Sequence, residues 1–227
     1  MTTTAIGLLV FPRVQQLDLT GPYDVFASWP DARVHLVAKR PETAVSSTGL
    51  VLTPTTSFAE CPPLDVVCVP GGVGVNALMD DEETLAFLRA QARGARFVTS
   101  VCTGALVLGA AGLLRGRRAT THWASHHLLA AFGAIPTQGR VVRDGELMTG
   151  GGVTAGIDFG LTVAAELAGE EVAKSIQLVL EYDPQPPFDS GSPEKAGAER
   201  VKRLRERLAP LLASRSKANA EAAARMS

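Results

Sequence analysis

The sequence predicts an α/β fold in which a mostly parallel sheet carries helices on both faces. Short apolar runs alternate with helical patterns along the chain, and these runs are continuous, as in strands buried on both faces. The 227 residues are 46% hydrophobic and 20% charged, close to the averages for soluble globular domains. A chain of this length can bury a sizeable core.

Each predicted element follows from its local pattern. Four apolar runs rich in β-branched residues predict strands at residues 5–10, 34–38, 66–69 and 97–101. Helical patterns predict helices at residues 24–28, 81–92 and 103–114. Because strands and helices alternate, we expect right-handed βαβ units.

One antiparallel hairpin interrupts this series. Residues 140–143 and 146–149 flank Asp144 and Gly145, and Asp-Gly is a strong signal for a two-residue hairpin turn. We expect this hairpin at an edge of the sheet. Three glycines at 150–152 then lead into a helix that ends near residue 168, and a further helix is expected over 170–182.

The C-terminal part has a different character. Residues 183–193 are rich in proline and break regular structure. Residues 194–227 hold nine Lys or Arg against four Glu. A basic tail could contact nucleic acid, but apolar residues recur at helical spacing at Val201, Leu204, Leu208, Leu211 and Leu212. We therefore predict an α/β domain over 1–193 and an amphipathic helical extension over 194–227, packed on the same domain or on a dimer partner.

Charge and cysteine content exclude several classes of protein. The formal net charge of −1 gives no field that would gather nucleic acid. No basic segment precedes the first apolar run, and no run reaches the roughly 18 apolar residues of a membrane span. The three cysteines lack CxxC spacing, so neither a disulfide framework nor a metal site is indicated. We expect a cytoplasmic protein without membrane or nucleic-acid partners.

Cys102 is the leading candidate for chemistry. A predicted strand runs directly into Cys102, small residues follow, and a helix begins, which is the arrangement of a nucleophile elbow. Unpaired N–H groups of the first helical turn would lower the thiol pKa from about 8.5 and favour a thiolate. The alternative is a buried structural thiol, which fits Cys68 within its apolar strand. Cys61, before two prolines, is expected to be an inert loop thiol.

A glycine turn is expected beside Cys102. Residues 70–74 follow the strand at 66–69 and leave the sheet at its carboxyl edge. The N–H groups of Gly72 and Thr103 could therefore bind charge that develops on a substrate. A phosphate loop is the alternative, but the sequence lacks both of its usual glycine patterns. After the triple glycine, Val153 is a candidate for an apolar wall around the substrate.

Two further side chains could move protons at this edge. Asp18 lies between two leucines, so partial desolvation should raise its pKa and make it a proton donor. Its alternative role is to cap a helix that starts near Pro22. His122 could approach Cys102, but no histidine directly follows the cysteine, so the sequence does not establish a Cys-His-acid triad.

Five segments resemble known proteins. They cover residues 15–22, 61–72, 99–104, 118–123 and 149–158, and include QQLDLTGP, VCTG and ATTHW. With them the chain resembles the ThiJ/PfpI group of the class I glutamine amidotransferase-like superfamily, and within it the isocyanide (isonitrile) hydratases. This resemblance implies a flavodoxin-like three-layer sandwich.

The resemblance also implies an activity. It implies a homodimeric, cofactor-free hydro-lyase that converts isocyanides to N-substituted formamides through a covalent cysteine thioimidate. The nucleophile falls on Cys102, the acidic partner on Asp18 and an assisting threonine on Thr103. Asp18 stands where many relatives carry Glu, and Thr103 where the protease-like branch has His, which argues against peptidase or deglycase activity.

Two other functions are compatible with the same motifs. AraC-type regulators carry a related ligand-sensing domain with very similar VCTG and ATTHW segments, followed by a pair of helix-turn-helix units. The residues after the α/β part are too few for such a pair, so we expect none. A stress-response thiol protein is the remaining alternative.

Overall fold

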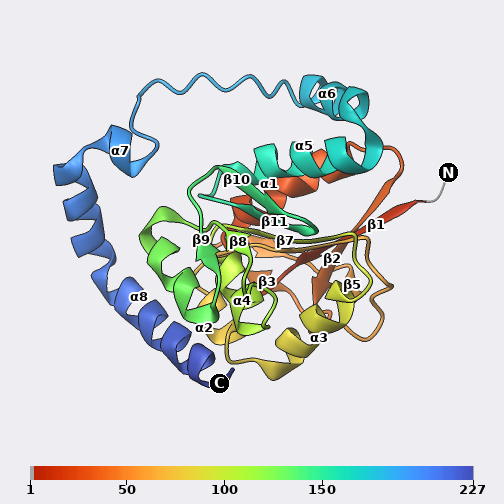
Figure 1. Cartoon of the computed structure of the whole chain (residues 1–227). Coiled ribbons are helices and arrows are strands. Elements are labelled where there is room, and N and C mark those ends of the chain that lie inside the picture. The colour runs from red at the N-terminus through yellow and green to blue at the C-terminus, as the bar shows by residue number, and fades with distance from the viewer. Residues whose placement is uncertain (1–2, 227) are drawn as a thin grey trace.

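The computed structural model describes residues 3–226 and has a seven-stranded sheet at its centre (Figure 1). The strand order is β10-β11-β7-β6-β1-β2-β5, and only β10 runs antiparallel to its neighbour. The strands of this sheet are β1 (Thr4–Leu9), β2 (Ala32–Ala38), β5 (Thr56–Ser57), β6 (Val66–Val69), β7 (Phe97–Val101), β10 (Val141–Asp144) and β11 (Leu147–Gly150). The expected strands and the edge hairpin are therefore confirmed.

Helices cover both faces of the sheet, which confirms the three-layer α/β sandwich. Helices α1 (Gln16–Ala27), α5 (Ala155–Ala168) and α6 (Glu170–Val179) lie above the sheet in Figure 1. Below it lie α2 (Val75–Leu78), α3 (Glu82–Ala92) and α4 (Gly104–Ala110). The buried apolar side chains accordingly form two clusters, one on each face.

Smaller elements join these layers. Two short strand pairs lie outside the main sheet, namely β3 (Ala44–Val45) with β4 (Val51–Leu52) and β8 (Arg118–Ala119) with β9 (Ile135–Pro136). A 3-10 helix, η1 (Trp123–Phe132), connects β8 to β9. Beyond α6 come α7 (Pro193–Ala196) and the long α8 (Ala198–Ala224). No helix among residues 3–226 is long and apolar enough to span a membrane.

The first helix differs from its prediction. It begins at Gln16, eight residues before the expected start at Asp24, and includes Pro22. Gly21 and Pro22 are unfavourable inside a helix, but tertiary packing stabilises the helix there, because Gly21 lies against Ile157 of α5. Asp18 therefore lies inside the helix, and the helix cap considered for it is wrong.

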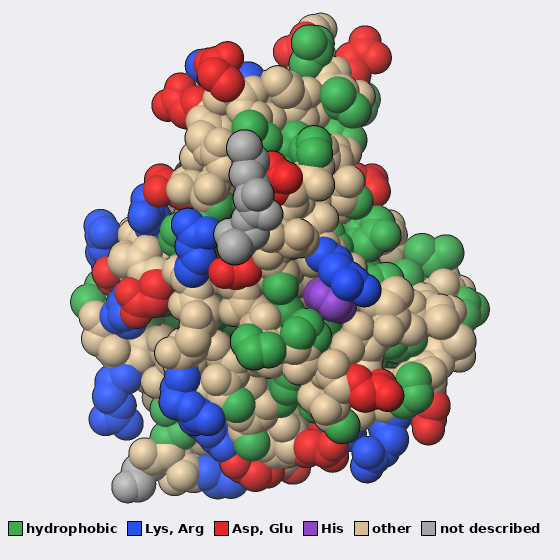
Figure 2. Space-filling model, turned by 90° about the vertical axis from the view of Figure 1, so that its right-hand side faces the viewer, with side chains coloured by type: hydrophobic (Ala, Val, Ile, Leu, Met, Phe, Trp, Pro, Cys, Tyr) green, Lys and Arg blue, Asp and Glu red, His purple; other side chains and the backbone are tan. Residues whose placement is uncertain are grey.

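Helix α8 lies along one side of the domain (Figure 1) and contacts α2, α4 and η1. Its C-terminal half buries Arg215, Asn219 and Ala222 against the domain. Asn219 donates to the Leu128 carbonyl at 3.2 Å. On the face of the molecule turned away from α8, acidic and basic side chains intermix with scattered apolar ones (Figure 2).

Candidate active site

Cys102 forms the tight turn between β7 and α4. Its φ of 55° lies in the left-handed region, which a residue other than glycine rarely adopts and which marks functional sites. The surrounding structure holds this conformation: the Cys102 N–H donates to the Gly150 carbonyl at 3.0 Å. The Cys102 carbonyl accepts from Thr121 Oγ1 at 2.6 Å. The expected nucleophile elbow is therefore present in the backbone.

The helix after this turn packs unusually close to the sheet. A Cβ atom on Gly104 would lie 1.9 Å from the Val69 carbonyl oxygen, so only glycine fits there. The close approach brings the start of α4 beside the glycine turn at 70–74. The elbow and the glycine turn thus form one edge of the site.

Asp18 is a fully buried carboxyl group beside the Cys102 thiol. Its Oδ2 accepts from the Gly71 N–H at 2.9 Å, while its Oδ1 has no well-formed hydrogen bond. Burial raises the pKa of Asp18 to about 7, although hydrogen bonding with the Cys102 thiol and the Gly71 N–H lowers it. The expected rise in pKa by desolvation is present, and this carboxyl can hold or release a proton near neutral pH.

The thiol itself differs from its prediction. Cys102 is only 5% exposed, and burial, followed by the negative charge of Asp18, raises the thiol pKa well above its usual value. The Thr103 N–H and Arg215 act in the opposite direction. The expected lowering of the Cys102 pKa is therefore wrong. The sequence indicated the helix N–H groups that lower this pKa, but it did not indicate the burial that raises it.

Asp18 and Cys102 therefore have to be treated as one titrating pair. Each of the two groups is disfavoured as an anion by burial, and each would repel a charge on the other. At neutral pH the pair can hold one proton and one negative charge. What decides reactivity is whether the proton rests on oxygen or on sulfur.

The glycine turn fixes Asp18 and Thr103 against each other. A Cβ atom on Gly71 would lie 2.5 Å from Thr103 N and 2.7 Å from Asp18 Oδ2. Thr103 Oγ1 accepts from the Gly72 N–H at 3.0 Å and donates to the Gly72 carbonyl at 3.3 Å. The Gly72 N–H, expected to bind developing charge, is thus occupied by the threonine hydroxyl in this structure.

The thiol opens into a cavity of about 330 Å³. Gly72, Thr103 and Val153 also line it, so the structure brings together four of the five residues singled out from the sequence, with Asp18 behind them. The rest of the lining comes from the glycine turn and from four other segments. It consists of Gln15, Ser47, Val73, His122, Ala124, Leu208, Leu211, Leu212 and Arg215.

The wall contributed by α8 was not foreseen. Leu208, Leu211 and Leu212 were recognised as an apolar stripe but were not expected to face the thiol. Arg215 continues this stripe at helical spacing, and it is only 5% exposed. A charged residue on the apolar face of an amphipathic helix was the signal that could have identified it.

His122 shares the cavity but is not equipped to activate the thiol. Its Nδ1 accepts from the Ala124 N–H at 3.3 Å, where it caps η1. Burial, and then the charge of Arg215, lower the pKa of His122 to about 4. The side chain is therefore neutral at physiological pH, and no Cys-His-acid triad forms.

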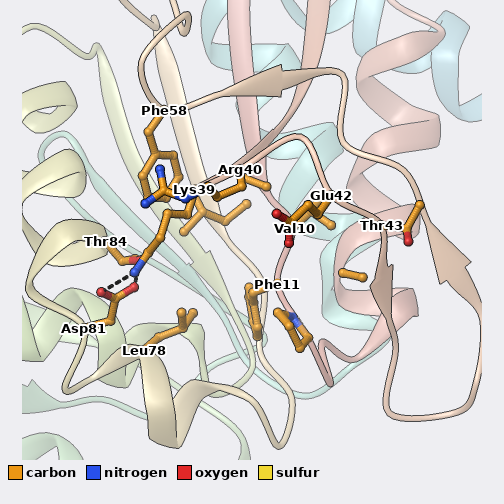
Figure 3. A pocket seen from close by; sticks show the side chains of 14 residues that line it. Val10, Phe11, Lys39, Arg40, Glu42, Thr43, Phe58, Leu78, Asp81 and Thr84 are labelled. Atoms are coloured by element: carbon orange, nitrogen blue, oxygen red, sulfur yellow. Dashed lines mark hydrogen bonds and ion pairs between the residues drawn. The ribbon is translucent and has the colours of Figure 1, made fainter.

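A second pocket, of about 300 Å³, lies beside the ends of β1 and β2 (Figure 3). It combines apolar side chains such as Phe11 and Phe58 with the ion pair between Lys39 and Asp81. It contains neither Cys102 nor Asp18. Within residues 3–226, no cluster of His, Cys, Asp or Glu has the geometry to hold a metal ion.

Comparison with known proteins places the chain in a family. Residues 4–166 match the DJ-1/PfpI family. The chain belongs to the DJ-1/PfpI family. This membership confirms the resemblance to the ThiJ/PfpI group and the flavodoxin-like fold.

Individual DJ-1/PfpI relatives refine this comparison. The chain is 63% identical to the isonitrile hydratase of Pseudomonas putida over 221 residues, which cover 97% of both chains. The crystal structure of a ThiJ/PfpI family protein from Pseudomonas syringae superimposes with a TM-score of 0.93 at 44% identity, over 96% of this chain and 91% of that one. The similarity thus includes the C-terminal extension as well as the α/β domain.

A regulator belongs to the same set of relatives. The HTH-type transcriptional regulator GbdR of Pseudomonas aeruginosa is 33% identical over 155 residues, which are 66% of this chain and 41% of that protein. In the present structure, the described residues beyond α6 form the short α7 and the single long α8. They do not form a pair of helix-turn-helix units.

Proposed function

We propose that this protein is an isocyanide hydratase, a hydro-lyase that converts R–N≡C and water into the formamide R–NH–CHO. The observation that carries the proposal is a buried carboxyl group, held by the Gly71 N–H on the inner side of the Cys102 thiol, which itself lines a largely apolar cavity. The relative from Pseudomonas putida that matches this chain over 97% of its length is an isonitrile hydratase. The reaction needs no metal or organic cofactor.

The first step adds S–H across the terminal carbon of the isocyanide. This carbon accepts a thiolate only if it also receives a proton, so a nucleophile and an acid must face the same atom. With the shared proton on Asp18, the Cys102 sulfur forms the C–S bond while the lone pair on carbon takes the proton from the carboxyl group. The product is the thioimidate R–N=CH–S–Cys102, and Asp18 is left as a carboxylate.

Water completes the reaction through the same carboxylate. Asp18 takes a proton from water as the oxygen attacks the thioimidate carbon, and it returns that proton to the nitrogen. Asp18 then takes the hydroxyl proton as the C=O bond forms and the C–S bond breaks. Formamide leaves, and the pair returns to a thiolate and a protonated carboxyl group. The raised pKa of Asp18, about 7, suits a group that must accept and donate in turn.

The cavity suits a substrate with an apolar group on nitrogen. Val153 and the three leucines of α8 supply apolar surface around Cys102, which suits the apolar group of an isocyanide. Thr103 assists through its N–H, which favours negative charge on the sulfur, while its hydroxyl bonds to Gly72 of the glycine turn. Because α8 forms part of the cavity, we propose that residues 194–227 complete a catalytic domain formed by 1–193.

We further propose a homodimer in the cytoplasm. Leu178, Val179 and Phe188 are large apolar side chains with at least 75% of their surface exposed, and exposed apolar surface can mark an interface. The three free cysteines suit a reducing compartment. Light scattering of the purified protein tests the dimer.

The decisive experiment is hydration of a simple alkyl isocyanide, followed by chromatographic measurement of the N-alkyl formamide. Cys102→Ala should reduce formamide production at least about 10³-fold, because the covalent intermediate cannot form. Cys61→Ala removes a half-buried thiol outside the cavity and should remain fully active. Formamide production by Cys102→Ala would refute covalent catalysis, and inactivity of the wild-type protein would refute the function.

A further inference from the structure

Arg215 stands out as a buried cation in the active-site cavity. It comes from the C-terminal extension, and it lines the cavity together with Cys102. Its guanidinium group makes three hydrogen bonds to neutral oxygen atoms. They are Nε to Asn76 Oδ1 at 3.3 Å, Nη1 to Ser125 Oγ at 3.3 Å and Nη2 to the Gly72 carbonyl at 3.0 Å.

The guanidinium has no carboxylate partner among residues 3–226. Other partly buried cations of this protein do have one: Lys39 pairs with Asp81 at 2.6 Å and Arg117 with Glu146 at 2.7 Å. Burying a charge without an opposite charge is costly, so such a group is retained where an anion arises during function. In this cavity, the group able to become an anion beside Arg215 is the Cys102 thiol.

We propose that Arg215 is the counter-ion of the Cys102 thiolate, a positioning residue that keeps the shared proton on Asp18 and the negative charge on sulfur. The inference rests on the proposed role of Cys102 as nucleophile. It assigns a catalytic purpose to the C-terminal extension, because without α8 the cavity would have no cation.

The groups around Asp18 and Cys102 differ in which of the two they favour as the anion. The Gly71 N–H donates to Asp18 and therefore favours negative charge on the carboxyl group. The Thr103 N–H and Arg215 both favour negative charge on sulfur. His122, the remaining titratable group in the cavity, is neutral at physiological pH. Arg215 is thus the one full positive charge among the described cavity residues that favours the reactive form, with thiolate and acid side by side.

An anchoring role for Arg215 predicts different behaviour. Its hydrogen bonds also attach α8 to the glycine turn and to η1, so its loss could simply loosen the helix. Asn219 lies one turn further along α8, is 2% exposed, and holds the same helix to the Leu128 carbonyl. Asn219→Ala is therefore a matched control that weakens the attachment of α8 without removing a charge from the cavity.

The test measures the pH dependence of alkylation of Cys102 by uncharged iodoacetamide, with the modified residue identified by mass spectrometry. Arg215→Gln should raise the apparent thiol pKa by about one unit and slow alkylation at pH 7 about tenfold, with a similar loss in kcat/KM for an isocyanide. Arg215→Lys keeps the charge and should stay within about threefold of wild type. Asn219→Ala should leave the thiol pKa unchanged, and alkylation of the fully buried Cys68 reports on unfolding in every variant.

Two results would overturn the proposal. One is an unchanged thiol pKa in a folded Arg215→Gln protein. The other is a folded Arg215→Lys protein whose Cys102 is alkylated as slowly as in Arg215→Gln. If Arg215→Gln does not fold, alkylation of Arg215→Lys at least tenfold more slowly than wild type has the same meaning. Because alkylation needs no isocyanide, either result can be distinguished from failure of the hydratase function, which would appear as absence of formamide with the wild-type protein.

Discussion

The pocket of Figure 3 and the Cys102 cavity treat their charged groups in opposite ways. In the pocket of Figure 3, Lys39 pairs with Asp81 at 2.6 Å and with Glu83 at 3.5 Å, and Thr84 donates to Asp81. At the Cys102 site, and among residues 3–226, Asp18 Oδ1 lacks a well-formed hydrogen bond and Arg215 lacks a carboxylate partner. Both pockets are of similar size, so size does not indicate which one performs chemistry.

This difference indicates where function resides. Charges that satisfy one another stabilise a fold and have little left to offer a ligand. Buried polar or charged groups without partners destabilise the resting protein. They are retained where the reaction supplies the missing partner. Three substitutions test the contrast, in decreasing order of expected effect on activity.

Asp18→Asn should have the largest effect. Activity should fall about 10²- to 10⁴-fold, the usual contribution of a general acid, while folding stability rises. Because folded Asp18 keeps its proton up to about pH 7 and the unfolded group only to 3.8, wild-type stability declines as pH rises through this window. At pH 8 the variant should be more stable by about 2 to 4 kcal/mol, measured by urea unfolding.

The pH dependence provides the internal check on Asp18. The gain in unfolding free energy from Asp18→Asn should shrink towards zero as pH falls from about 7 to 4. Asp24→Asn, an exposed carboxyl group on the same helix, should change neither activity nor this profile. A destabilised Asp18→Asn protein at pH 8 would contradict the assignment of Asp18 as an unsatisfied buried acid.

Gly71→Ala should have the next largest effect. The added Cβ would meet Thr103 N at 2.5 Å and Asp18 Oδ2 at 2.7 Å, so the carboxyl group must move away from the thiol. We expect kcat/KM to fall about 10- to 100-fold, as for misplacement of a reacting group by about 1 Å. Gly94→Ala, where nothing lies within 4 Å of the new Cβ, is the control. Full activity of Gly71→Ala would show that the separation of Asp18 from Cys102 is not critical.

Lys39→Met should have the smallest effect. Its ion pairs are partly exposed, with 35% of the Lys39 side chain accessible, so we expect unfolding free energy to fall by at most about 1 kcal/mol. Formamide production should not change. Loss of activity comparable to that of Gly71→Ala would mean that the pocket of Figure 3 takes part in the reaction, and would remove the contrast between the two regions.

Local patterns in the sequence were sufficient to predict the sheet and the elbow. Continuous β-branched runs, the Asp-Gly turn and the small residues after Cys102 each reflect constraints within a few residues of the chain. The start of α1 was mispredicted because Gly21 and Pro22 resemble a turn locally, whereas the helix is held by packing against α5. The raised pKa of Asp18 was predicted from its two leucine neighbours, but the burial that causes it comes from packing against the glycine turn at Gly71.

Local sequence patterns were enough to predict the α/β fold, the candidate nucleophile Cys102 and its candidate acid Asp18. Only the folded structure shows that burial of Cys102 opposes the local effect of helix α4 on the pKa of its thiol. It also decided that Arg215, 113 residues further along the chain, lines the cavity of that sulfur. Desolvation and long-range charge depend on which distant segments meet, and a reading of neighbouring residues contains no such information.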